Sequence, residues 1–221
     1  FDFFFFVGGT GSIASGVTQV THQGVTAYGY ANYLDGRGYV AAELVYRNIP
    51  NDHGLGVFST ENDAVLGKDE MDPNYGEQSE LSNQRNPELI VLEKASNAVW
   101  TELWLSSLDF SADTPPVAEQ GTLYWANVLP TTFTDFSWTM GKFEFEAGDV
   151  STAGSSVEGV LGAPYASFST AQYLFFVPGW TSNPANTNND YLVWCGATAV
   201  PEPGTLSLLG LGLIGIGLLR R

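Results

Sequence analysis

Residues 88–93, ELIVLE, and residues 100–105, WTELWL, are the stretches of sequence that decide the fold. Branched aliphatic and aromatic residues dominate both, and such residues favour strands over helices. The segment KASN between them is typical of a turn. In the second stretch, the two-residue period of a strand predicts that Trp100, Glu102 and Trp104 share one face. The sequence therefore predicts two strands joined by a short turn.

Similar short segments occur along the rest of the chain, separated by turns rich in glycine, proline and asparagine. They are residues 17–21, 25–30, 39–46, 122–126, 133–140, 142–146, 173–177 and 191–195. Many short strands of this kind indicate an all-β fold, a single β-sandwich or jelly-roll-like domain. A chain of 221 residues without an internal change in composition favours one such domain, at residues 1–198. Residues 199–221 form a separate tail.

The charge of the chain is strongly acidic. It carries 24 acidic and 8 basic residues, which gives a formal net charge of -16. Proteins that bind nucleic acid neutralise phosphates with lysine and arginine, so we expect no nucleic-acid partner. The acidity either keeps the domain soluble or attracts cations.

An acidic loop at residues 61–80 is the candidate metal site. Asp69, Asp72, Asn74 and Glu77 offer the hard oxygen ligands that calcium prefers. The loop departs from the EF-hand pattern and has no flanking helices, so an ordinary solvated loop is the alternative. Calcium is the one cofactor that the sequence indicates.

Catalysis has little support in the sequence. His22 and His53 are the two histidines, and neither lies in a nucleophile or metal motif. Glu144 and Glu146 share one face with Lys142, which is typical of the solvent side of a strand. We therefore expect no enzymatic activity, with a secreted hydrolase as the weaker alternative.

Tryptophans could form a platform on which sugar rings stack. Trp100, Trp104 and Trp180 are the candidates for glycan binding. Core packing is the alternative, since aromatic side chains bury the largest surface.

The C-terminal tail has three parts. Val200-Pro201-Glu202-Pro203 is expected to be extended, because proline disfavours helix at the preceding residue. Residues 205–219 carry no charge and precede Arg220 and Arg221. As a helix of about 1.5 Å per residue they would reach about 22 Å, short of a hydrocarbon core of ~30 Å. The terminal arginines favour a cytoplasmic C-terminus and place the acidic domain outside.

This tail resembles the sorting signal of PEP-CTERM proteins, which combines a Val-Pro-Glu-Pro box, a hydrophobic helix and a basic end. In that family the signal is recognised by exosortase, a membrane-embedded enzyme similar to cysteine proteases. The proteins are linked to exopolysaccharide, biofilm or floc in Gram-negative bacteria. Residues 54–57 and 88–92 also resemble an element common in their extracellular domains, which look like β-sandwiches.

The resemblance implies a protein exported to the cell surface or matrix. Its partners would be exosortase, the inner membrane through a transient or permanent C-terminal helix, and extracellular polysaccharide. Any signal peptide would have been cut before Phe1. A structural or adhesive role is the leading prediction, and a calcium- or glycan-binding module is the alternative.

Overall fold

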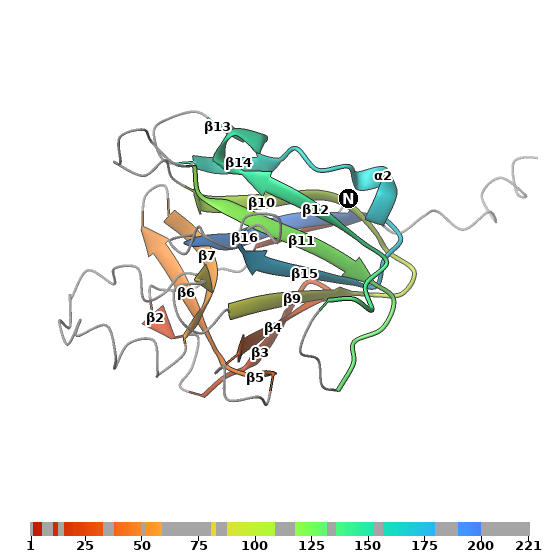
Figure 1. Cartoon of the computed structure of the whole chain (residues 1–221), viewed down its shortest axis with the longest axis horizontal. Coiled ribbons are helices and arrows are strands. Elements are labelled where there is room, and N and C mark those ends of the chain that lie inside the picture. Colours follow the sequence, from red (N-terminus) through yellow and green to blue (C-terminus); the bar gives the residue numbers. More distant parts are fainter. Residues whose placement is uncertain are drawn as a thin grey trace, which may run out of the picture.

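The computed structural model describes residues 2–5, 11–12, 16–32, 38–49, 52–58, 81–82, 88–108, 118–131, 136–152, 157–179 and 190–199. In these residues the chain forms two antiparallel sheets, drawn in Figure 1. The predicted all-β sandwich is thereby confirmed.

The larger sheet has nine strands among the described residues. Their order is β13 (Val150–Thr152), β14 (Val157–Leu161), β10 (Val99–Leu108), β16 (Asp190–Ala199), β7 (Asp52–Phe58), β6 (Glu43–Ile49) and β2 (Gly11–Ser12). Two short strands, β1 (Asp2–Phe5) and β8 (Leu81–Ser82), also pair with β16.

The smaller sheet has seven described strands. Their order is β12 (Gly141–Glu146), β11 (Gln120–Ala126), β15 (Tyr173–Pro178), β9 (Glu88–Lys94), β4 (Val25–Asn32) and β3 (Gln19–His22), with β5 (Tyr39–Ala41) on β4. In β4, buried residues alternate strictly with half-buried ones, as expected for a strand with one face on the core.

The two strands predicted at residues 88–93 and 100–105 both form, but they belong to different sheets. Their ends are held by the segment that follows the short helix α2 (Tyr165–Phe168), which Figure 1 shows at one end of the strands. Lys94 N donates to Gln172 O (3.2 Å), and Trp100 N donates to Ser169 O (2.8 Å). The turn between the strands therefore crosses one end of the sandwich.

Two further predictions about strands were wrong, and one strand was missed. Residues 39–46 are two strands in different sheets, separated at Ala42, whose N–H donates to Gly29 O (2.9 Å). The described part of residues 133–140 forms bends and turns, closed by the bond from Thr139 Oγ1 to Phe136 O (2.7 Å). Strand β7 was not predicted, because its two glycines and the preceding Pro50 and Asn51 resemble a loop.

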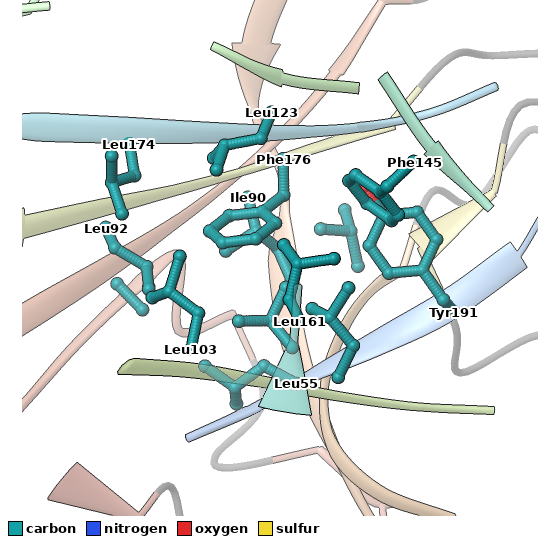
Figure 2. Packing of buried hydrophobic residues seen from close by; sticks show 14 of the residues in the cluster. Leu55, Ile90, Leu92, Leu103, Leu123, Phe145, Leu161, Leu174, Phe176 and Tyr191 are labelled. Carbon is teal, nitrogen blue, oxygen red and sulfur yellow. The ribbon is translucent and has the colours of Figure 1, made fainter. Parts of the chain in front are cut away.

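The main core lies between the two sheets. Figure 2 shows side chains from both sheets converging, among them Leu55 and Leu103 of the larger sheet and Ile90 and Phe176 of the smaller one. All four side chains are fully buried. Burial of each such side chain stabilises the fold by about 1.5–3 kcal/mol, so this layer holds the sheets together.

A second apolar cluster lies on the outer face of the smaller sheet. It comprises Tyr39, Leu89, Val91, Tyr124, Ala126 and Phe175. Phe136 stacks on Tyr124 with ring centroids 4.4 Å apart, and Trp138 contacts the Phe175 ring edge-on at 5.0 Å. The segment after β11 therefore covers part of this outer face.

No helix in the described part of the chain is long and apolar enough to cross a bilayer. The helix predicted at residues 205–219 lies outside the described residues.

Candidate aromatic binding site

A β-bulge in β10 separates the tryptophans that the sequence placed on one face. Trp100 pairs with Thr198 and Glu102 pairs with Ala197, so Thr101 is an extra residue in β10. The bulge reverses the alternation before Glu102, so the predicted shared face is wrong for Trp100, whereas Glu102 and Trp104 do share a face.

Trp100 consequently belongs to the core. Its side chain is 1% exposed, and its Nε1 donates to Ala171 O (2.9 Å). A surface platform for glycans therefore does not include Trp100.

Trp104 lies on the opposite side of β10 from this core. Its neighbours Leu103 and Leu105 are fully buried between the sheets, whereas Trp104 is half-buried. Its Nε1 donates to Glu102 Oε1, which fixes the indole along the strand. Trp104 is thus the one predicted glycan-binding tryptophan that the structure places on an outer face in the described residues.

A second bulge brings another tryptophan beside Trp104. Trp104 pairs with Cys195 and Leu105 pairs with Val193, so Trp194 is the extra residue in β16. The Trp194 ring meets the Trp104 ring edge-on, at 5.3 Å and 84°. Two half-buried indoles therefore lie nearly at right angles on the outer face of the larger sheet.

His53 of β7 completes the arrangement. Its imidazole stacks on Trp194 with centroids 5.5 Å apart and an interplanar angle of 30°. Its backbone is fixed by Ser106: His53 N donates to Ser106 Oγ (3.0 Å), and Ser106 Oγ donates to His53 O (2.5 Å). Together, Trp104, Trp194, His53 and Glu102 form what we call the tryptophan cluster.

The chemistry of the tryptophan cluster suits a ligand with both apolar and hydroxyl surfaces. Indole faces offer flat apolar area, and a nearby carboxylate and imidazole offer hydrogen-bonding groups. Trp194 and His53 were not predicted as binding residues. The alternation in residues 191–195 identifies the strand, but nothing in that segment alone reveals the bulge that turns Trp194 outward.

The paired carboxylates of β12 form no comparable site. Lys142 Nζ lies 2.8 Å from Glu144 Oε1 in an exposed ion pair, which confirms the predicted solvent side. The two histidines lie in different sheets, His22 in β3 and His53 in β7.

Other predicted site residues lie outside the described part of the chain. They are Trp180, the calcium candidates Asp69, Asp72, Asn74 and Glu77, and the sorting residues Val200, Pro201, Glu202, Pro203, Arg220 and Arg221. Within the described residues, no three His, Cys, Asp or Glu side chains gather where they could hold a metal ion.

Comparison with known proteins identifies the tail. Neither the curated proteins nor the solved structures include a match to this chain. The family model of the PEP-CTERM protein-sorting motif matches residues 199–221 and confirms the predicted sorting signal. The chain therefore carries a PEP-CTERM protein-sorting motif at residues 199–221, which supports a protein that is exported and sorted by exosortase.

Proposed function

We propose that this exported protein is a non-enzymatic, adhesive component of the extracellular matrix and holds polysaccharide on its tryptophan cluster. The sorting motif supports export of the β-sandwich, and the resemblance to PEP-CTERM proteins links such domains to extracellular polysaccharide. The observation that carries the proposal is the pair of half-buried indoles, Trp104 and Trp194, on the outer face of the larger sheet.

Stacking supplies a physical reason for this choice of ligand. The apolar C–H faces of a sugar ring can bury part of the two indoles, and aromatic contacts stabilise beyond the area that they bury. Glu102 and His53 flank the indoles and can exchange hydrogen bonds with sugar hydroxyls. Because Glu102 holds the Trp104 indole and His53 stacks on Trp194, little conformational freedom is lost on binding.

Binding can be measured with the full chain and polysaccharide purified from the matrix of the source bacterium. Trp104→Ala and Trp194→Ala should each weaken binding about 2- to 10-fold, the loss of one aromatic contact. Met140→Ala is the control, because Met140 is a 60% exposed apolar side chain whose N–H donates to Trp125 O of the smaller sheet. Equal effects of all three substitutions would refute this site.

Two further measurements test the other parts of the proposal. The polysaccharide should keep its chain length after prolonged incubation, whereas progressive shortening would indicate a hydrolase. Mass spectrometry of the surface protein should find a C-terminus near Pro203, the outcome of processing by exosortase. A mature protein ending at Arg221 would contradict that processing.

A further inference from the structure

A row of polar side chains crosses the outer face of the smaller sheet. Thr21 pairs with Thr26, Thr26 pairs with Glu93, and Glu93 pairs with Tyr173, so the row crosses β3, β4, β9 and β15 in register. We call these four residues the polar row. Thr21 is exposed and the other three are half-buried. At about 4.8 Å between strands, the row extends about 14 Å.

Glu93 is the centre of the polar row. Tyr28 Oη donates to Glu93 Oε2 (2.5 Å), and Tyr173 Oη donates to Glu93 Oε1 (3.0 Å). Each carboxylate oxygen therefore accepts one hydrogen bond from a residue that the structure describes. Since a carboxylate offers about four lone-pair positions, Glu93 retains the capacity to accept further donors.

The two tyrosines hold the Glu93 carboxylate through neutral donors. Burial, followed by the hydrogen bond to Glu93, raises the pKa of both Tyr28 and Tyr173. Both phenols therefore stay protonated and neutral at ordinary pH. Neither described hydrogen bond to Glu93 comes from a cationic side chain, so its negative charge is available to a ligand.

The charge of Glu93 and of the whole chain favours a cationic ligand. A carboxylate held by neutral donors attracts a cation, and the net charge of -16 repels acidic polymers from the whole molecule. The faces of the tyrosine rings beside Glu93 can add a cation–π contribution. The threonine hydroxyls, whose Oγ1 atoms lie 2.8 Å apart, add neutral hydrogen-bonding groups further along the row.

We propose that the polar row binds an amino sugar of a polysaccharide, with the ammonium group on Glu93 and the sugar hydroxyls along the threonines and tyrosines. A small cation would use Glu93 alone, whereas a chain of amino sugars uses both the charge and the length of the row. This site lies in the other sheet from the tryptophan cluster and does not depend on it. One molecule could therefore hold two polysaccharide chains on opposite faces of the sandwich.

Calorimetry on the full chain tests the assignment with two oligosaccharides of equal length, a glucosamine oligomer and its fully N-acetylated form. The glucosamine oligomer should bind at least about tenfold more tightly, the usual effect of a charge-assisted hydrogen bond. Glu93→Gln should remove that difference. Glu144→Gln is the matched control, because it removes one negative charge from the same sheet at a carboxylate paired with Lys142.

Tyr173→Phe provides a second variant that keeps the charge but removes one donor, and it should weaken binding a few-fold. Thermal unfolding of each variant checks that the fold is retained. Equal binding of the two oligomers, or equal effects of Glu93→Gln and Glu144→Gln, would overturn the proposal. Equally tight binding of an oligolysine peptide through Glu93 would overturn the choice of amino sugar.

Trp104→Ala keeps this test independent of the tryptophan cluster. It should leave the preference for the glucosamine oligomer over its N-acetylated form unchanged while it weakens binding of the matrix polysaccharide. A loss of that preference in Trp104→Ala would show that the polar row is not a separate site.

Discussion

Gly54 of β7 lies directly against the backbone of Trp194 in β16. A Cβ atom on Gly54 would lie 2.9 Å from both N and Cα of Trp194 and 2.8 Å from Val193 O. Gly54 also has a φ of +143°, which L side chains rarely adopt. Since Trp194 is the bulged residue and His53 stacks on it, Gly54 lets β7 approach closely enough to complete the tryptophan cluster.

Gly54→Ala should therefore destabilise the protein and weaken binding of matrix polysaccharide. Backbone strain alone costs about 1–3 kcal/mol, and the contact with Trp194 adds to it. Gly24→Ala is the control, because Gly24 has a φ of +78° and a Cβ added there would meet no atom within 4 Å. Chemical denaturation should show a larger loss for Gly54→Ala, and an equal loss would mean that β7 can move away from β16.

Trp100 and Trp104 should respond differently to alanine. Trp100→Ala leaves a cavity between the sheets and should cost about 3–5 kcal/mol of unfolding free energy. Trp104→Ala removes a half-buried side chain on the outer face and should cost roughly 1 kcal/mol or less, since the indole keeps solvent contact. Urea denaturation measures both, and similar losses would contradict the placement of the bulge at Thr101.

Tyr165 should make the fold sensitive to alkaline pH. Its hydroxyl accepts from Leu103 N (2.8 Å) and donates to Leu161 O (3.0 Å), and burial raises the pKa of Tyr165 to about 12. The unfolded chain releases this proton near pH 10, so above that pH the folded state holds more protons. Stability then falls as pH rises from 10 to 12, by up to about 2–3 kcal/mol from this residue.

Tyr165→Phe isolates this effect. It should lower stability at neutral pH by about 1–2 kcal/mol through the lost hydrogen bonds, but reduce the slope of stability against pH between 10 and 12. Unfolding free energies measured at several pH values give the slope. An unchanged slope would assign the alkaline sensitivity to the other tyrosines whose pKa is raised, such as Tyr191.

The sequence was sufficient for those features that a short segment encodes by itself. The alternation in residues 25–30 and the apolar run at 88–93 predicted β4 and β9, and the linear pattern at 199–221 predicted the sorting motif. It did not predict which sheet each strand joins. A strand such as β10 has the same residue preferences in either sheet, and its partner is chosen by packing across the whole sandwich.

The tryptophan cluster was predictable only in part, because it too depends on how strands pack against one another. Trp104 was a candidate from its position in a strand, but the bulges at Thr101 and Trp194 arise from the fit between β10 and β16. Those bulges decide that Trp100 is buried and that Trp194 joins Trp104. His53 lies in β7, whose glycines conceal a strand from any prediction based on residue preference.

Lys94, at the end of β9, is a lysine that is only 2% exposed. Its Nζ lies 3.4 Å from Thr170 O, and burial lowers the pKa of Lys94 below its usual 10.5. The unfolded state therefore binds more protons between the lowered pKa and 10.5, and the contribution of Lys94 to stability rises with pH across that window.

Lys94→Met keeps most of the apolar stem and removes the buried charge, so it should raise the unfolding free energy at neutral pH by roughly 1 kcal/mol. The gain should shrink as pH rises toward 10.5, because the buried lysine of the wild-type protein loses its proton and no longer carries a charge. Above 10.5 the lysine is neutral in both the folded and the unfolded chain. Lys142→Met is the matched control at an exposed ion pair and should change stability by about 0–1 kcal/mol in the opposite direction. A gain for Lys94→Met that does not depend on pH would show that better packing, and not relief of the buried charge, stabilises the variant.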